Sequence, residues 1–542
     1  MATGKTSLAV TDEDEEVVFM AQPTSRGPIR DADSILEAAP RGRFVAGEAF
    51  FNYAAFGSLR EGLPAVSLGS SRYIGLAVNA VVAGFATTFY WAAVRPLLLH
   101  HIAVHHHERV ETVDKLLEWP GTFSVFIGLL SDCFPILGLR RKSYMILGWV
   151  VSCIATLAIA ITASISDDSG AFFGYFYCIL IVIAAIAYQV SWIASLAMTV
   201  EYAQREHLYE RGSLQSSYML LNYTASSITL AIVPQLIIPQ DDGTLTTHLS
   251  LPASCIVVAV SALLVIPFLA NNLAEERCEP SGKVTLGGRV GELWNVLQQK
   301  VVYCIFFFLV GAVFLFSAEH EDVAAAMAYW SDVTTPKQRY IPLAMTVPKV
   351  ISLIVWKVAL INYDWRKVGA AGIFFYALCK LALRVPCVYD GVRADWYYFL
   401  WKALGELPQS WFELFVLVLP NEIAEIGREG VTIGLVNSFV MLISIAAGTL
   451  WDSLNDAVGI RIKAEDIAAD SSKTRDNVMI AVVVYVVINV LGVATVWFLP
   501  SQKLDAQQLR AFGGYNKNAR SVIVLGFVLL LAYDIMSSFG YL

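Results

Sequence analysis

The chain has 542 residues, of which 56% are hydrophobic and only 15% are charged, and its formal net charge is -8. Soluble domains carry about 25% charged residues, so this composition excludes an ordinary soluble protein. Runs of roughly twenty apolar residues recur along the chain, and each is long enough to cross a lipid bilayer as a helix. We therefore predict an all-α polytopic membrane protein. The negative net charge argues against nucleic acid as a partner.

The amino-terminal residues 1–72 contain an acidic run from Asp12 to Glu16 and no early apolar core. A segment of this composition cannot bury enough apolar surface to fold by itself. It also lacks the apolar region of a cleavable signal peptide. We expect residues 1–72 to form a cytosolic, largely disordered tail.

Twelve apolar spans follow this tail, in two sets of six. The first set, within residues 73–270, consists of 73–98, 116–134, 144–165, 172–200, 214–238 and 251–270. The second set, within residues 299–499, consists of 299–317, 340–361, 367–387, 396–419, 430–452 and 477–499. The polar stretch 271–298 is the expected cytosolic linker, and a thirteenth run, 521–539, lies in the carboxy-terminal extension 500–542. We expect two six-helix bundles plus one extra carboxy-terminal helix.

The orientation follows from the positive charges of the loops. Lys and Arg are more frequent in the loops on the side of Arg140 than in the opposite loops. Because cytoplasmic loops carry the excess of positive residues, we expect Arg140 and the amino terminus to face the cytosol. The lack of a transit-like amino end favours the plasma membrane.

The loop between the second and third spans has a distinctive charge pattern. Asp132 ends one span, a Pro/Gly turn follows, and Arg140, Arg141 and Lys142 precede the next span. Cations beside the first turn of a helix can reach a carboxylate at the end of the previous helix, which locks the two spans on one membrane face. The alternative is a simple positive-inside anchor.

A weak repeat of this pattern occurs in the second half. Asp364, Arg366 and Lys367 lie between the eighth and ninth spans, at the place that corresponds to the first loop. Two parallel repeats are typical of transporters built from two bundles. We predict that both sets of charges form a cytosolic latch that favours one conformational state.

Three blocks carry a family resemblance. They are residues 117–149, which include the first charged loop, residues 205–215 before the fifth span, and residues 425–435 before the eleventh. Together they resemble the folate-biopterin transporter family, a branch of the major facilitator superfamily, from about Arg72 to Pro500. The resemblance implies a twelve-helix transporter that moves a folate or pterin by alternating access, coupled to protons.

The tenth span is the richest in charge. Lys402, Glu406, Gln409 and Glu413 step by four, three and four residues, so all four lie on one helical face. Lys402 and Glu406 can pair with each other, which leaves Glu413 without an evident local cation. A buried, unpaired carboxylate binds protons more readily. We predict that Glu413 couples proton movement to transport, with Glu406 as the second choice.

Cations in neighbouring spans offer a second interpretation. Lys349 follows Pro348 in the eighth span, and Lys380 lies in the ninth. Such cations can receive the carboxylates of an anionic substrate, and we predict substrate contacts for Lys349, Lys380 and Gln409. The alternative is an internal ion pair with Glu406 or Glu413 that only holds helices together.

Aromatic and polar side chains share one face of the first span and one face of the fourth. A flat heteroaromatic ring needs aromatic surfaces to stack on and a few fixed hydrogen-bonding groups. The predicted contacts are Thr88, Trp91 and Arg95 in the first span and Tyr188, Trp192 and Thr199 in the fourth. Packing between helices is the alternative, and it is our interpretation of the polar stripe of span five, which includes Asn222 and Ser226.

The sequence contains no nucleophile–base set and no metal-binding motif. The eight cysteines form no C-x-x-C pair, and we interpret most of them as small apolar residues within spans. We therefore expect no enzyme, no cofactor and no metal. Two other functions stay open, namely transport of another heteroaromatic or anionic metabolite by the same fold, and a membrane receptor that binds a solute without moving it.

Overall fold

A computed structural model describes residues 58–60, 62–105, 110, 114, 117, 119–165, 171–239, 245–278, 286–316, 318–458 and 462–538. All of them belong to the unit that begins at Phe56. Helices dominate these residues, which confirms the all-α prediction. Two short strands, β1 (Ile237–Pro239) and β2 (Leu245–Thr247), pair antiparallel in the loop after the fifth span.

The helices of the first half follow the predicted spans closely. They are α3 (Ile74–Phe89), the π-helical turn η1 (Tyr90–Val94), α4 (Arg95–His105), the 3-10 turn η3 (Trp119–Phe123), α6 (Ser124–Cys133), α7 (Lys142–Thr162), α8 (Ala171–Ala203), α9 (Ser213–Leu236) and α10 (Leu251–Asn271). The first span runs past its predicted end because α4 continues it from the π-helical turn.

The second half contains a similar series. Its helices are α12 (Lys300–Phe316), α13 (Glu321–Trp330), α14 (Thr335–Gln338), α15 (Ile341–Val355), the π-helical turn η4 (Trp356–Leu360), α16 (Trp365–Val388), α17 (Asp395–Ile423), α18 (Glu429–Val458), α19 (Ala464–Ala469), α20 (Ser472–Leu491) and the 3-10 turn η5 (Gly492–Phe498). Among the described residues, three more helices lie outside the predicted bundles: α11 (Leu286–Val296) in the linker, and α21 (Lys503–Phe512) and α22 (Lys517–Ser538) after the last span.

Within the described residues, nine helices are long and apolar enough to cross a membrane, or up to ten if the bent pair α12 and α13 forms one span. The two axes of that pair meet at 47°. Helix α22, the predicted thirteenth, belongs to the nine. The long helices α9 and α17 do not, and they carry the polar stripe of span five and the charged face of span ten.

Small residues let the helices of the first half approach closely. A Cβ atom at Gly84 of α3 would lie 2.2 Å from the carbonyl oxygen of Asn222 on α9, and one at Gly148 of α7 would lie 2.5 Å from the carbonyl oxygen of Ala187 on α8. Close backbone approach of this kind is typical of helix packing in membranes.

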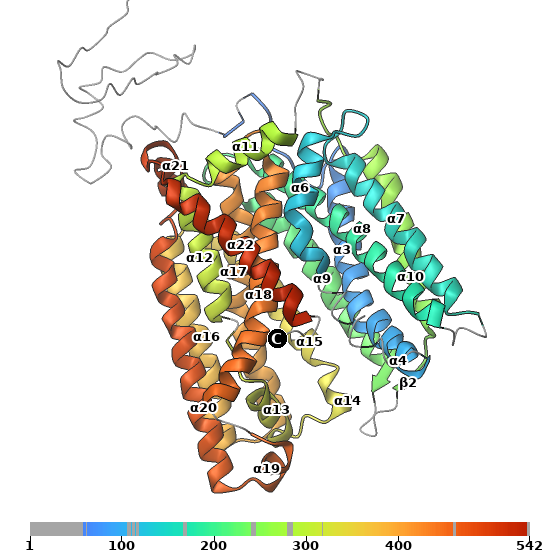
Figure 1. Ribbon diagram of the computed structural model, residues 1–542, viewed down its shortest axis with the longest axis vertical. Helices are drawn as coiled ribbons and strands as arrows, with labels where there is room; N and C mark the ends of the chain where they lie inside the picture. The colour runs from blue at the N-terminus through green and yellow to red at the C-terminus, as the bar shows by residue number, and fades with distance from the viewer. Residues whose placement is uncertain are drawn as a thin grey trace, which may run out of the picture. The chain divides into compact units, whose positions relative to one another are not determined.

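Helix α18 joins the two halves. It packs against α6 and α8 of the first half and against α12 and α17 of the second. Helix α22 also packs against α18 (Figure 1), where the rings of Phe439 and Phe527 lie 5.4 Å apart and Thr449 and Tyr533 share a hydrogen bond of 3.0 Å. Another contact between the halves joins α9 to α15.

Candidate functional site

A cavity of about 620 Å³ lies between the helices of the first half and α18. Aromatic rings and small residues form most of its wall, and uncharged polar side chains interrupt them. Its aromatic residues are Tyr90, Trp91, Trp149, Tyr188, Trp192 and Tyr223. Its amide side chains are Gln189, Asn222 and Asn437.

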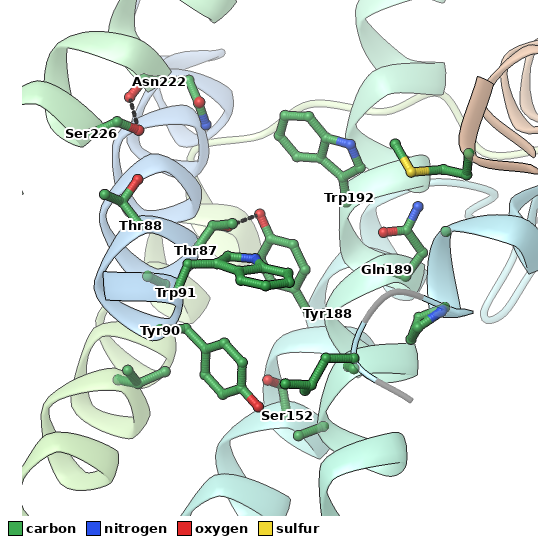
Figure 2. A pocket seen from close by; sticks show the side chains of 18 of the residues that line it. Thr87, Thr88, Tyr90, Trp91, Ser152, Tyr188, Gln189, Trp192, Asn222 and Ser226 are labelled. Carbon is green, nitrogen blue, oxygen red and sulfur yellow. Dashed lines mark hydrogen bonds between the residues drawn. The ribbon is translucent and has the colours of Figure 1, made fainter. Parts of the chain in front are cut away.

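Four residues predicted from the sequence lie on this wall: Thr88, Trp91, Tyr188 and Trp192. Figure 2 shows Trp91 on the first span facing Tyr188 on α8, and Thr87 donates a hydrogen bond to the Tyr188 hydroxyl. The Tyr188 ring also meets the Trp149 ring edge to face, at 5.7 Å between centroids. This contact fixes the direction in which Tyr188 enters the cavity.

The π-helical turn η1 explains why Tyr90 and Trp91 line the cavity as neighbours. Such a turn inserts an extra residue into a helix, and π-bulges are frequent at functional sites. Helical periodicity alone singled out Trp91 and not Tyr90, because an ideal α-helix directs consecutive side chains about 100° apart. Both side chains contribute to the wall.

Two amides that the sequence analysis missed meet at one serine. Gln189 of α8 and Asn437 of α18 donate to the Ser124 hydroxyl over 2.9 Å and 2.8 Å, and Ser124 donates to the Gly121 carbonyl over 2.6 Å. Ser124 is completely buried. The three bonds therefore orient amides from both halves at the edge of the cavity. A signal was present, since Asn437, Met441 and Ser444 recur at helical spacing in an apolar span and all three line the cavity.

The polar stripe of span five has two roles in the structure. Asn222 donates to the Ala80 carbonyl and Ser226 to the Gly84 carbonyl, both over 3.2 Å. These bonds join α9 to α3, as the packing interpretation expects. Both side chains also line the cavity (Figure 2).

Arg95, Thr199 and Gln409 lie off the cavity wall. Arg95 pairs with Asp114 at 2.5 Å, and its guanidinium lies 4.8 Å from the centre of the Trp91 ring. Thr199 is buried and donates to the Leu196 carbonyl of its own helix, because its face of α8 packs in the core at that depth. The geometry therefore keeps Arg95 as a neighbour of the cavity and separates Thr199 and Gln409 from it.

The charged face of α17 is paired across helices rather than along one. Lys349 of α15 lies 2.6 Å from Glu413 and 3.5 Å from Glu406, and Tyr223 of α9 donates a hydrogen bond to Glu413. The assumption that Glu413 lacks a local cation is therefore wrong, and Lys349 rather than Lys402 lies beside Glu406. Spacing along one helix could not reveal a partner on another.

Lys380 lies in a separate cluster of the second half. It is buried and donates to the Ala318 carbonyl and to Asn489, over 3.3 Å and 3.0 Å, and its ammonium lies 4.6 Å from the centre of the Tyr376 ring. One turn further along α16, Arg384 pairs with Glu319. None of these residues lines the cavity described above.

Asp132 ties the first half to the second. Its carboxylate pairs with Arg141 and accepts hydrogen bonds from the amides of Gly430 and Val431, at 3.3 Å and 2.7 Å, in the first turn of α18. Arg141 is fully buried and also lies 3.1 Å from Glu429. A carboxylate at a helix amino terminus is favourable because exposed amides and the helix dipole attract it.

The remaining charges of the two predicted latches differ in their contacts. The Arg140 amide donates to Glu275 at 2.8 Å, and the Arg140 guanidinium lies against Gly427 of the second half, 2.8 Å from where a Cβ atom would stand. Asp364 caps its own helix by accepting from the amides of Arg366 and Lys367, at 2.9 Å and 3.2 Å. The Arg366 side chain donates to the Leu499 carbonyl. Among the described residues, the Asp364 carboxylate thus acts as a helix cap, and its role in a latch stays a prediction.

Arg60, in the predicted tail, adds to the Asp132 cluster. It pairs with Glu429 of α18 and lies 3.3 Å from Glu201 of α8, and it also donates to Gln204 over 3.1 Å. Its side chain is 8% exposed. Residues 1–57 and 61 of the predicted tail lie outside the described residues, but at Arg60 the chain is packed between the two halves.

Comparison with known proteins shows which family the chain matches. A model of the BT1 family matches residues 83–509. A folate-biopterin transporter of Synechocystis sp. is 25% identical over 189 residues, and this alignment spans 34% of each protein, so only about a third of that relative is matched.

The fold is similar to solved major facilitator structures. The proton:xylose symporter XylE, bound to 6-bromo-6-deoxy-D-glucose, has a TM-score of 0.54 and 11% identity over 81% of this chain and 98% of its own. The human organic anion transporter MFSD10 has a TM-score of 0.51 and 12% identity over 79% of this chain and 99% of its own. The chain therefore has the fold of major facilitator proteins, with several helices long and apolar enough to cross a membrane, and it belongs to the BT1 family.

Proposed function

We propose that this transporter moves a pterin-like heteroaromatic solute, namely folate, biopterin or a related pterin, by proton-coupled alternating access. The observation that carries the proposal is the aromatic, uncharged cavity between the first half and α18. A volume of about 620 Å³ lies within the usual range of small-molecule sites, about 300–1,000 Å³.

The chemistry of the wall suits a flat ring with polar edges. Trp91, Tyr188 and Trp192 offer aromatic faces for stacking. The amides of Gln189 and Asn437 carry both donors and acceptors, and Ser124 holds them in place from two helices. A pterin ring presents donors and acceptors along its edge, so it can use both kinds of group at once.

The absence of charge on the wall refines the substrate class. Among the described residues that line the cavity, none is Asp, Glu, Lys or Arg. The cavity therefore suits an uncharged ring, and the carboxylates of a folate would have to lie outside it. Two cations lie beside aromatic residues of the wall. The Arg95 guanidinium is 4.8 Å from the centre of the Trp91 ring, and the Lys349 ammonium is 5.5 Å from the centre of the Tyr223 ring. We propose that these two cations bind the carboxylates of a folate.

Alternating access requires a closure that can open. The Asp132 cluster supports such a role, because Asp132 and Arg141 of the first half meet Glu429 and the first turn of α18. We propose that this cluster is the latch, that it faces the cytosol together with the amino terminus, and that the protein lies in the plasma membrane. The carboxylate for proton coupling is Glu413, with Glu406 as the second choice, since Glu413 is 32% exposed and contacts both halves.

The test is uptake of radiolabelled folic acid and biopterin by proteoliposomes, with and without an inward proton gradient. We expect accumulation that the gradient stimulates. Trp192→Ala, within the cavity, should abolish most of it, whereas Trp497→Ala, whose side chain is 80% exposed, serves as the matched control. Lack of uptake by folded wild-type protein would contradict the proposal and favour another heteroaromatic metabolite, and binding without uptake would indicate a receptor.

A further inference from the structure

We propose that Tyr223 is the positioning residue that couples occupation of the cavity to the charge cluster of the second half. The inference rests on the proposed transport function and assigns its coupling to one hydroxyl group. Tyr223 lies on α9 and is a wall residue of the cavity. Its hydroxyl donates a hydrogen bond to Glu413 on α17. The same side chain thus touches the substrate space and the carboxylate proposed for proton coupling.

The surroundings of Glu413 show how the link works. Lys349 of α15 lies 2.6 Å from Glu413, and its ammonium lies 5.5 Å from the centre of the Tyr223 ring. The carboxylate is therefore held by one ammonium and one phenol, from opposite halves. Removing the Tyr223 hydroxyl would leave Lys349 as the contact of this carboxylate from the second half alone.

A phenol is rigid, so its ring and hydroxyl move together. A flat ligand that stacks on Tyr223 competes with Lys349 for the ring or turns the ring, and in either case it disturbs the bond to Glu413. Binding of the ligand then changes the proton affinity of Glu413. Because linkage is reciprocal, protonation of Glu413 also changes the affinity of the cavity for the ligand.

The other charges around Glu413 make its protonation tolerable. Glu406, on α17 itself, is 3.5 Å from Lys349, so Lys349 keeps one carboxylate when the other takes a proton. Lys402, also on α17, and Tyr376, from α16, lie close enough to Glu406 to interact with it electrostatically. The groups that face the pair are therefore Lys349 from α15, Tyr223 from α9 and Tyr376 from α16.

Tyr223→Phe tests the proposal because it removes the hydroxyl and keeps the ring. Tyr209→Phe is the matched control, since it is the same substitution at a side chain that is 66% exposed and lies off the cavity wall. Biopterin exchange across the membrane and gradient-driven biopterin accumulation are measured for each variant. We expect Tyr223→Phe to retain exchange and to lose accumulation about tenfold or more, as expected for one charge-assisted hydrogen bond. Tyr209→Phe should change neither.

Two results would overturn the inference. One is unchanged accumulation by Tyr223→Phe, and the other is an equal loss of exchange and accumulation, which indicates a purely structural or binding role. A ligand-free measurement separates this inference from the proposed function. Tryptophan fluorescence is titrated with pH in wild type, Glu413→Gln and Tyr223→Phe, since Trp91, Trp149 and Trp192 line the cavity.

We expect a pH transition of the wild-type fluorescence that is lost in Glu413→Gln and shifted in Tyr223→Phe. A transition at the same pH in wild type and Tyr223→Phe would contradict the link even if no pterin binds. The transition could instead differ between wild type and Tyr223→Phe as expected, while wild-type protein neither binds nor exchanges biopterin. That result would contradict the proposed substrate class and would still support the link between Tyr223 and Glu413.

Discussion

The charged loop of residues 131–144 and its counterpart at residues 363–367 share a weak charge pattern, but among the described residues it is the first that joins the two halves. Asp132 and Arg141 are buried against the first turn of α18. Asp364 caps α16, and Arg366 remains 42% exposed beside Asp505. The same residue types at a helix end thus form either a contact between the halves or a helix cap, depending on what lies opposite them.

The difference arises from how closely the neighbouring helix approaches. A Cβ atom at Gly128 of α6 would lie 2.0 Å from the carbonyl oxygen of Gly430 on α18, so these backbones touch. At Gly369 of α16 the nearest atom is a Val496 side-chain carbon at 3.5 Å. In the second half another residue makes the connection, since Lys503 of α21 donates to the Leu208 carbonyl and to Asn362, both over 3.1 Å.

The largest effect should come from removing Arg141. Arg141→Ala leaves Asp132 and Glu429 buried without this cation, which costs about 3–5 kcal/mol in buried pairs. We expect a lower melting temperature in detergent. In a variant with Cys133 as its sole cysteine, which is 6% exposed here, we also expect faster labelling by a polar maleimide.

Arg366→Ala is the matched change in the second half. It removes one hydrogen bond from the side chain to the Leu499 carbonyl and a partly exposed ion pair with Asp505, and we expect a cost of about 1 kcal/mol. Equal losses of stability in Arg141→Ala and Arg366→Ala would contradict the proposed difference between the two charged loops.

The next largest effect should come from Gly128, where the backbones of α6 and α18 approach closely. Gly128→Ala places a methyl group against the Gly430 carbonyl, and overpacking of this kind costs about 1–3 kcal/mol. We expect α6 and α18 to separate and Cys133 to become more reactive. Gly369→Ala should leave stability and labelling unchanged, because its Cβ meets only ordinary van der Waals contact. A stable, unreactive Gly128→Ala protein would show that the approach is not required.

We also expect the stability of the first half to depend on pH, because of Glu206. Glu206, in the loop after α8, is buried and accepts hydrogen bonds from the amides of Gly212 and Leu214, at 2.8 Å and 2.9 Å. Burial raises the pKa of its carboxyl from 4.5 to about 7, against the lowering effect of these bonds. The folded state then binds more protons than the unfolded state between these values, so this contribution to stability falls as pH rises from about 4.5 to about 7.

Glu206→Gln should flatten that part of the profile. The measurement is the melting temperature from pH 4.5 to pH 8 for wild type and variant, in one detergent and one salt concentration. If the two profiles run parallel across this window, Glu206 does not titrate there.

The smallest effect should come from Asp364. Asparagine caps helices about as well as aspartate, whereas alanine in place of either costs about 1 kcal/mol. We expect Asp364→Asn to melt like wild type and Asp364→Ala to lose about this amount. Asp132→Asn should lower the melting temperature, because it removes the charge that faces Arg141. If Asp364→Asn strongly accelerated the labelling of Cys133, Asp364 would belong to the proposed latch.

Several residues of the candidate site could be predicted from the sequence. The spacing of Thr88 and Trp91, and of Tyr188 and Trp192, predicted two faces that do meet at one cavity. Helical periodicity is sufficient for such residues because a straight helix carries them on one side. Tyr90 required the π-helical turn, which a periodic pattern does not show. Asn437 shares helical spacing with Met441 and Ser444, but only the approach of α18 brings it to the same serine as Gln189.

The sequence by itself determined the membrane class, the helices and the family resemblance, because apolar run length and local charge patterns are properties of single segments. Only the tertiary structure decided the partners of the charges. Glu413 pairs with Lys349 of another helix, Asp132 meets the first turn of α18, and Asp364 stays on its own helix. Electrostatic contacts act over a few ångströms, and which groups come that close depends on how the helices pack, which spacing along one helix does not encode.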